Sequence, residues 1–260
     1  MIKCGIIGYP LKKPRSVKLW KEYFLKKNIN SKMLEFSFKE REFHKEIKKL
    51  INNQEFLASA ITMPYKIIIQ KYINYLNETA KLSKSVNLIV KSKKKIFGFN
   101  TDVFGLLKSL SKKILIKNII IIGLGGSGNA IFNYINKKYK RNFILITSKN
   151  IPIKKNIEIY KNLNKAKIDY DKKYLIINCT PLGSNLRKKF LKKTPIEDNI
   201  LGKISKKSFI FDLVYKPEKT KLFYQCKKYK LNYKNGLEMN TLQGKMALNI
   251  ISKLTKFKLK

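Results

Sequence analysis

The stretch Ile119-Ile120-Ile121-Ile122-Gly123-Leu124-Gly125-Gly126-Ser127-Gly128 decides the fold. Four β-branched apolar residues in a row are typical of a strand that is buried on both faces of a parallel sheet. Apolar residues with helical spacing follow over residues 131–135. The stretch therefore predicts a strand, a glycine turn and a helix in succession.

The glycines of this turn have the spacing of a dinucleotide-binding motif. Gly123 permits a tight turn, Gly125 lets a pyrophosphate approach the backbone, and Gly128 lets the helix pack closely on the strand. The phosphates would accept hydrogen bonds from free N–H groups at the helix N-terminus. A glycine-rich turn that binds no ligand is the alternative.

Composition excludes several classes of protein. The 260 residues are 44% hydrophobic, which is enough for buried cores, and the net charge is +42. The lysines are spread through every segment, so we expect no nucleic-acid partner, although an anionic ligand would gain from electrostatic steering. No apolar run approaches the ~20 residues of a membrane span, so we expect no membrane partner.

The cysteines and the single histidine indicate where the protein works and by what chemistry. Cys4, Cys179 and Cys226 are far apart and lack metal-ligand spacing, so we expect reduced thiols, a cytoplasmic protein and no metal site. His44 lies in a Lys/Glu-rich amphipathic helix, where a surface role is expected. This position disfavours reaction schemes that depend on a histidine base.

Strand and helix patterns alternate along the whole chain. Strands are predicted at residues 2–7, 34–38, 57–63, 86–90, 96–99, 119–122, 143–147, 174–178 and 209–214, with a last short strand before Gly236. Helices are predicted at residues 17–27, 43–51, 77–84, 102–110, 131–135, 220–229 and 241–254. Residues 148–173 carry weaker signals. The pattern predicts an α/β protein with two α/β halves and a cleft between them.

A bound nicotinamide dinucleotide implies hydride transfer, for which the protein must supply a proton donor or acceptor. Thr62 and Lys66 follow a predicted strand, and Pro64 between them fixes a turn at the sheet edge where ligands bind. Asp102 begins a predicted helix, whose dipole favours its charge. An ammonium beside a carboxylate can donate a proton to a carbonyl oxygen, so Lys66 and Asp102 are the catalytic candidates.

These residues belong to motifs that resemble those of shikimate dehydrogenases. The motifs, spread over nearly the whole chain, are Thr62-Met63-Pro64-Tyr65-Lys66, Asn100-Thr101-Asp102-Val103-Phe104-Gly105, the glycine turn, Asn178-Cys179-Thr180-Pro181-Leu182-Gly183, Asp212-Leu213-Val214-Tyr215-Lys216-Pro217 with Thr220, and Gly236 with Met239, Gln243 and Gly244. The resemblance implies NADPH-dependent reduction of 3-dehydroshikimate to shikimate, in the biosynthesis of chorismate and the aromatic amino acids. It also implies catalysis by Lys66 with Asp102.

The resemblance further implies two domains and two sets of binding residues. A substrate domain with a mixed sheet would span residues 1–101, joined by a C-terminal helix at about 237–260, and a Rossmann-like NADP(H) domain would span residues 102–236. The substrate residues would be Ser16, Thr62, Asn87, Asp102, Tyr215 and Gln243. The cofactor residues would be Gly123, Gly125, Gly126, Ser127, Gly128, Thr147, Ser148, Lys149, Thr180, Leu213 and Gly236.

The sequence departs from the family pattern at several positions. Pro14 and Leu88 replace a serine and a threonine, and Ala60 replaces an asparagine, so we expect weaker substrate binding. Ser148 and Lys149 replace the arginine-containing motif that holds the 2′-phosphate of NADP, and Lys154 and Lys155 follow. No acid stands where NAD-binding folds place one, so NADP(H) should be preferred over NAD(H). Because lysine lacks the planar fork of arginine, this preference should be weaker than in family members that have the arginine.

Two alternatives to this function remain. One is a related dehydrogenase that acts on quinate or another polyol acid. The other is a dinucleotide-binding protein that has lost catalysis, which the missing serine and the high charge would favour. The oligomeric state is expected to be a monomer or a homodimer.

Overall fold

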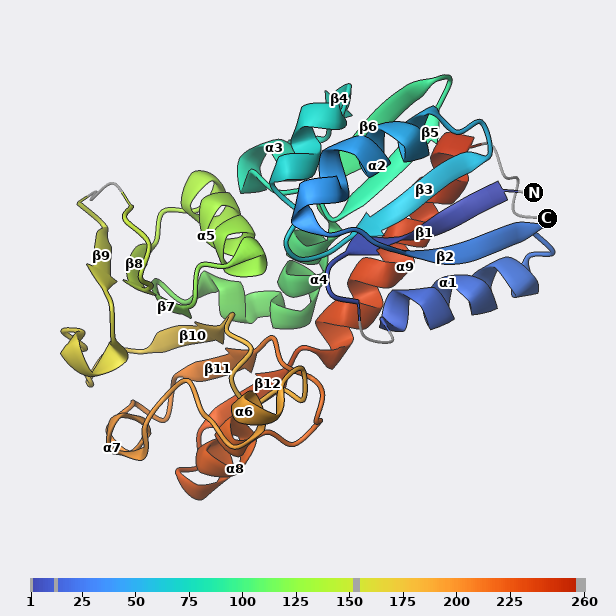
Figure 1. The fold of residues 1–260 in the computed structure, drawn as a ribbon. Helices are drawn as coiled ribbons and strands as arrows, with labels where there is room; N and C mark the ends of the chain where they lie inside the picture. The colour runs from blue at the N-terminus through green and yellow to red at the C-terminus, as the bar shows by residue number, and fades with distance from the viewer. Residues whose placement is uncertain (1, 12–13, 152–154, 256–260) are drawn as a thin grey trace. The chain divides into compact units, whose positions relative to one another are not determined.

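The computed structural model describes residues 2–11, 14–151 and 155–255, and the chain divides into two compact units. Unit 1 comprises Met1–Gly105 and Thr241–Lys260, and unit 2 comprises Leu106–Asn240. Each unit contains one six-stranded sheet (Figure 1). The predicted α/β class is confirmed.

The sheet of unit 1 is mixed. Its order is β2-β1-β3-β5-β6-β4. The strands are β1 (Ile2–Gly8), β2 (Ser31–Ser37), β3 (Phe56–Ile61), β4 (Tyr75–Leu76), β5 (Leu88–Ser92) and β6 (Lys95–Phe99). β1 pairs in parallel with β2 and β3, whereas β5 is antiparallel to β3 and β6. The antiparallel strands β5 and β6 therefore make this sheet mixed, as the family resemblance implied, while the two-residue β4 was not predicted.

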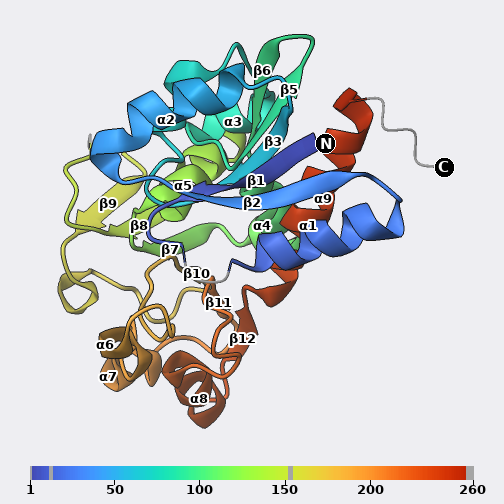
Figure 2. The same ribbon diagram turned by 45° about the vertical axis from the view of Figure 1, so that its right-hand side comes forward.

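Helices cover both faces of this sheet (Figures 1 and 2). α2 (Glu40–Asn52) and α3 (Glu78–Ser83) pack on one face, with Phe43, Ile47 and Ala80 in the core. α1 (Arg15–Lys26) and α9 (Leu237–Thr255) pack on the other, with Trp20, Phe24, Leu248 and Ile251 in the core. The last helix of the chain is thus a structural layer of the unit that contains the first strand.

α1 begins two residues earlier than predicted, at Arg15. Pro14 takes the N-cap position with φ −67° and ψ 133°, and its ring presets a backbone angle from which a helix can start. Ser16, which stands just before the helix predicted at residues 17–27, therefore lies in the first turn of α1.

Unit 2 contains a parallel, doubly wound sheet with the order β12-β11-β10-β7-β8-β9. The strands are β7 (Asn118–Ile122), β8 (Asn142–Ile146), β9 (Ile157–Tyr160), β10 (Tyr174–Asn178), β11 (Phe209–Asp212) and β12 (Asn232–Asn235). The chain proceeds outward from β7 through β8 to β9, then returns to the other side of β7 to add β10. Ligands of such sheets bind at the carboxyl ends of the strands at this switch point, here between β7 and β10.

Two apolar clusters cover the two faces of β7, which explains the run of four isoleucines. Ile119 and Ile121 pack with α4 (Thr101–Leu110) and α5 (Gly126–Lys138). Ile120 and Ile122 pack on the opposite face, towards α7 (Asp198–Leu201) and α8 (Lys221–Lys228). None of the four is more than 4% exposed, so β7 is buried on both faces as predicted.

The weakly patterned residues 148–173 contain a strand, β9, that the sequence analysis missed. β9 is only four residues long and lies at the edge of the sheet, so only Ile157 is buried and Glu158 is exposed. The four-residue helices α6 (Lys188–Leu191) and α7 were also missed, because one turn carries no periodicity. Within the described ranges, no helix has the length and apolar character that a bilayer span requires.

Candidate active site

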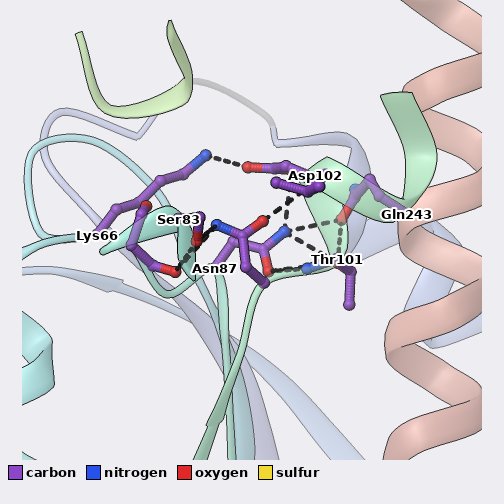
Figure 3. Close-up of polar contacts among 9 residues, drawn as sticks. Lys66, Ser83, Asn87, Thr101, Asp102 and Gln243 are labelled. Atoms are coloured by element: carbon purple, nitrogen blue, oxygen red, sulfur yellow. Dashed lines mark hydrogen bonds and ion pairs between the residues drawn. The ribbon is translucent and has the colours of Figure 1, made fainter. Parts of the chain in front are cut away.

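Lys66 and Asp102 form an ion pair in unit 1 (Figure 3). Lys66 lies beyond the carboxyl end of β3, and Asp102 lies in the first turn of α4. Lysine Nζ is 2.5 Å from carboxylate Oδ2, and the side chains are 12% and 13% exposed. The pair is thus largely shielded from water yet retains some access to it, as a group that exchanges a proton with a substrate requires.

Asn100 holds the start of α4 in place. Its Oδ1 accepts a hydrogen bond from the backbone N–H of Val103 at 3.2 Å, which is the geometry of a helix N-cap. Its Nδ2 donates to the carbonyl of Ser85 at 2.9 Å and to the hydroxyl of Ser83 at 3.0 Å. Asp102 therefore occupies a fixed helix N-terminus, where the partial positive charge favours a carboxylate.

A buried polar network surrounds this pair (Figure 3). Asn87 donates from Nδ2 to Asp102 Oδ1 and to Thr101 Oγ1, both at 2.9 Å. The Thr101 hydroxyl donates to Gln243 Oε1 at 3.1 Å. Four predicted site residues, Lys66, Asn87, Asp102 and Gln243, thus meet in one place, although Gln243 comes from α9 at the far end of the chain. Thr101 is an additional member that the sequence analysis did not assign, and its only signal was its place inside the Asn100-Thr101-Asp102 motif.

Thr62 and Ser16 are the other predicted substrate residues of unit 1. Thr62 follows β3, and its backbone N–H donates to the carbonyl of Ile7 at 2.9 Å. Its methyl group fills the space that a Cβ at Gly8 would need. A residue with a side chain at position 8 would therefore displace Thr62. Both Thr62 and Ser16 are partly exposed. Tyr215 belongs to unit 2, where it follows β11.

The departures from the family pattern have different structural settings. Leu88 is fully buried in the apolar cluster beneath α1 and α9, so its side chain serves the core of unit 1. Ala60 is partly buried on β3 and packs against the same cluster. Pro14 makes no side-chain capping bond to α1. The expected weaker substrate binding stays a prediction.

The glycine turn of unit 2 requires glycine at two positions and leaves open space at a third. Gly123 has φ +88°, and a Cβ there would lie 2.6 Å from the Thr180 methyl carbon. A Cβ at Gly128 would overlap the carbonyl oxygen of Gly123, so glycine is needed for α5 to pack on β7. Gly125 differs, because a Cβ there would meet no atom within 4 Å. The open space beside Gly125, at the switch point of the sheet and before Gly126 and Ser127 of α5, fits a bound pyrophosphate.

The predicted contacts to the cofactor ribose follow β8. Thr147 is 9% exposed, and its Oγ1 accepts from the backbone N–H of Lys149 at 3.1 Å, which closes a small turn. Ser148, Lys149 and Lys155 are exposed, while Lys154 lies outside the described residues. The turn offers hydroxyl and ammonium donors to solvent at the carboxyl edge of the sheet.

A buried carboxylate organises the remaining predicted cofactor residues. Asp212, at the end of β11, is fully buried and accepts hydrogen bonds from Asn178 Nδ2 at 2.8 Å, Val214 N at 3.0 Å, and the Thr220 and Tyr233 hydroxyls at 3.1 Å. Burial raises the pKa of Asp212 above its usual value, and the four donors oppose that shift.

Hydrogen bonds connect Asp212, through Asn178, to Thr180 beside the glycine turn. Because Asn178 donates to Asp212, its Oδ1 is free to accept from both the N–H and the hydroxyl of Thr180, at 2.9 and 2.7 Å. Thr180 is thereby fixed against Gly123. Gly236 approaches so closely that a Cβ would overlap the carbonyl oxygen of Leu213. Asp212 and Thr220 were quoted as motif residues, but their structural role was not foreseen.

Comparison with known proteins gives consistent matches along the chain. The family model described as "Shikimate dehydrogenase substrate binding domain" matches residues 6–89. The chain is similar to Shikimate dehydrogenase (NADP(+)) of Clostridium botulinum (strain 657 / Type Ba4), with 32% identity over 259 residues and 96% of each chain covered. It is similar to the protein of that name from Pelagibacter ubique (strain HTCC1062), with 34% identity over 263 residues, 96% of this chain and 92% of that one.

The fold is similar to a solved structure as well. The crystal structure of a chorismate mutase/shikimate 5-dehydrogenase fusion protein from Clostridium acetobutylicum aligns with a TM-score of 0.80 and 25% identity, over 98% of this chain and 92% of that one. The alignments with the two relatives and with this structure extend over both units.

Proposed function

Since this chain belongs to the shikimate dehydrogenase family of NADP-dependent oxidoreductases, we propose that it catalyses the reversible NADPH-dependent reduction of 3-dehydroshikimate to shikimate, in the biosynthesis of chorismate and the aromatic amino acids. The observation that carries this proposal is the Lys66–Asp102 pair with Asn87 and Gln243 around it. It supplies a proton donor and several short polar side chains in one place, as reduction of a hydroxylated keto acid requires.

Lys66 is the proton donor of the proposed reaction. When bound, NADPH supplies the hydride that converts the carbonyl carbon to the alcohol carbon. The Lys66 ammonium donates its proton to the carbonyl oxygen, and the neutral amine accepts that proton back in the oxidative direction. Asp102 Oδ2 orients the ammonium through the 2.5 Å contact.

Substrate recognition is assigned to short polar side chains. The proposed residues are Ser16, Thr62, Asn87, Asp102, Tyr215 and Gln243. A substrate with several hydroxyls and a carboxylate needs a partner for each polar group, and each group left unpaired costs about 1–3 kcal/mol. Binding groups of this kind discriminate strongly against analogues that lack a hydroxyl.

Cofactor binding is assigned to unit 2. The proposed residues are Gly123, Gly125, Gly126, Ser127, Gly128, Thr147, Ser148, Lys149, Thr180, Leu213 and Gly236. The open space beside Gly125 would receive the pyrophosphate, and the turn at Thr147 the 2′-phosphate of NADP(H). Unit 1 is correspondingly the substrate domain. The sequence suggested domain boundaries near residues 101 and 237. The division of the chain into two compact units, at residues 105 and 240, supports this assignment.

An NADPH-consumption assay with 3-dehydroshikimate tests the proposal, with Lys66→Ala as the inactive control. Oxidation of shikimate and of quinate by NADP⁺, measured in parallel, separates the alternatives. A higher kcat/KM for quinate would identify the related polyol-acid dehydrogenase. NADPH binding without turnover on any of these substrates would identify a non-catalytic dinucleotide-binding protein.

The cellular setting and assembly belong to the same proposal. A cytoplasmic protein is supported by the three free cysteines, of which Cys4 and Cys226 are buried and Cys179 is partly buried. A monomer or a homodimer is proposed for the quaternary state. Light scattering on the purified protein distinguishes these two and would reveal any larger assembly.

A further inference from the structure

The orientation of the Asn87 amide follows from a backbone contact. The N–H of Thr101 donates to Asn87 Oδ1 at 2.7 Å. A backbone N–H can only donate, so the atom that faces it must be the amide oxygen. The amide nitrogen of Asn87 therefore faces Thr101 Oγ1 and Asp102 Oδ1, each at 2.9 Å. These two acceptors use both of its hydrogens.

The Thr101 hydroxyl is left with one possible role. It accepts from Asn87 Nδ2, so its single hydrogen must be donated elsewhere. Two acceptors lie in reach, Gln243 Oε1 at 3.1 Å and Asn87 Oδ1 at 3.3 Å. Asn87 Oδ1 already accepts the shorter bond from the Thr101 backbone, so Gln243 Oε1 is the better acceptor.

The Gln243 amide is thereby oriented as well. Turning this amide over would place its NH₂ group 3.4 Å from the NH₂ group of Asn87, with two donors facing each other. Its oxygen therefore faces Thr101, and its two N–H donors face away from the network. Gln243 is partly exposed, whereas Thr101 is only 2% exposed.

We infer that Thr101 is a positioning residue for the reaction: its buried hydroxyl fixes the Gln243 amide so that Nε2 donates to an oxygen of the substrate. Thr101 acts through Gln243 and does not itself contact the substrate. This inference rests on the proposed function and deepens it, because it assigns a hydrogen-bond acceptor, a hydroxyl or carboxylate oxygen, to the part of the substrate that Gln243 binds.

The test compares Thr101→Val, which replaces the hydroxyl by a methyl group, with Thr101→Ser, which retains it. We expect KM for shikimate to rise about tenfold in Thr101→Val, the effect of one lost hydrogen bond to a substrate, with KM for NADP⁺ within about threefold of wild type. Thr101→Ser should restore KM. Thr79→Val is the matched control, because it removes another threonine hydroxyl of unit 1 that bonds Asn77.

A double variant distinguishes positioning from a general structural effect. If Thr101 acts through Gln243, adding Thr101→Val to Gln243→Ala raises KM no further. Additive effects would overturn the inference, as would an unchanged KM in Thr101→Val or an equal rise in KM for NADP⁺.

Should Thr101→Val fail to fold, Gln243→Glu tests the same orientation of the Gln243 amide. This variant keeps an acceptor towards Thr101 but removes the Nε2 donor, so KM for shikimate should rise. A normal KM for Gln243→Glu would exclude the inferred orientation. Failure of the proposed function is distinct, because the wild-type protein would then lack turnover.

Discussion

Lys66 Nζ lies 2.5 Å from Asp102 Oδ2, although 36 positions separate the two residues in the sequence. The other carboxylate oxygen, Oδ1, accepts a hydrogen bond from Asn87 at 2.9 Å. Both oxygens of Asp102 are therefore engaged, and the ammonium is held against a carboxylate that cannot easily rotate. The two members of this pair should respond differently to substitution.

Lys66→Ala should lower kcat by at least ~100-fold and leave the affinity for shikimate within about tenfold, because it removes the proton donor and few binding contacts. Steady-state kinetics and shikimate titration measure the two quantities separately. Lys71→Ala, a change at an exposed lysine of the same unit, is the control. A variant that kept kcat but lost affinity would mean that Lys66 only binds the substrate.

Asp102→Asn should impair both kcat and KM, because the new amide must turn its NH₂ group towards either the Lys66 ammonium or the Asn87 amide nitrogen. Either orientation sets two donors against each other. The measurement is kcat and KM for shikimate at saturating NADP⁺, with circular dichroism to establish folding. Wild-type kinetics in this variant would remove Asp102 from the mechanism.

Gly125→Ala should leave the fold intact and weaken the binding of the cofactor. The backbone at Gly125 has φ −68°, which alanine adopts readily, and its Cβ would meet no protein atom within 4 Å. The methyl group would instead occupy the space proposed for the pyrophosphate, so KM for NADPH should rise at least about tenfold with an unchanged Tm. In Gly128→Ala the Cβ would overlap the Gly123 carbonyl, so that variant should lose stability as well. An unchanged KM in Gly125→Ala would argue that the pyrophosphate does not bind here.

NADPH should be preferred over NADH, and the preference should fall as salt is added. Ser148 and Lys149 are exposed, and charges in water are largely screened beyond about 10 Å at 0.1 M salt. Lysine also lacks the planar fork with which arginine holds a phosphate, so Ser148→Arg should raise the preference. The ratio of kcat/KM for the two cofactors at low and high ionic strength measures this, with Lys207→Gln as an exposed control. A ratio near or below one at low salt would refute the prediction.

Asp212→Asn should change how stability depends on pH. Burial raises the pKa of Asp212 above its usual 3.8 in the folded protein, so the folded state binds a proton more readily than the unfolded chain. This preference for the proton stabilises the folded wild-type protein below pH 3.8, and the stabilisation is lost as pH rises through the pKa of Asp212 in the folded state. Asparagine does not titrate, so the variant neither gains nor loses this stabilisation. The free energy of unfolding of the variant, relative to wild type, should therefore increase from about pH 4 towards neutral pH. Urea unfolding at several pH values measures it, and a constant or opposite trend would mean that the four donors outweigh burial.

The part of the fold that local pattern determines could be predicted. The run of four isoleucines indicates a strand covered on both faces, and β7 is such a strand because each pair of isoleucines enters a different cluster. Pattern fails where an element is too short to have a period, as in β4, α6 and α7. β9 also escaped, because an edge strand buries few residues and Glu158 interrupts its apolar run.

The candidate site could be predicted only in part. The positions of Lys66 and Asp102 at element ends follow from Pro64 and from the helix start. Contact between Asn87 and Gln243, 156 positions apart, follows from no local signal, and only the resemblance to a family indicated that both belong to one site. Thr101 and Asp212 were missed as organising groups because their importance lies in the direction of hydrogen bonds, which depends on partners brought together by the fold.

The place of α9 in unit 1 has a consequence for synthesis of the chain. Trp20 and Phe24 of α1 share one apolar cluster with Leu248 and Ile251 of α9, so the cover on this side of the first sheet is incomplete until α9, which follows unit 2 in the sequence, has been made. By that time the whole of Leu106–Asn240 has been made, and unit 2 can close its core first. A nascent chain that stops near residue 240 would present an uncovered apolar face to chaperones and proteases, and it would also lack Gln243, so the same final segment completes both the core and the catalytic centre.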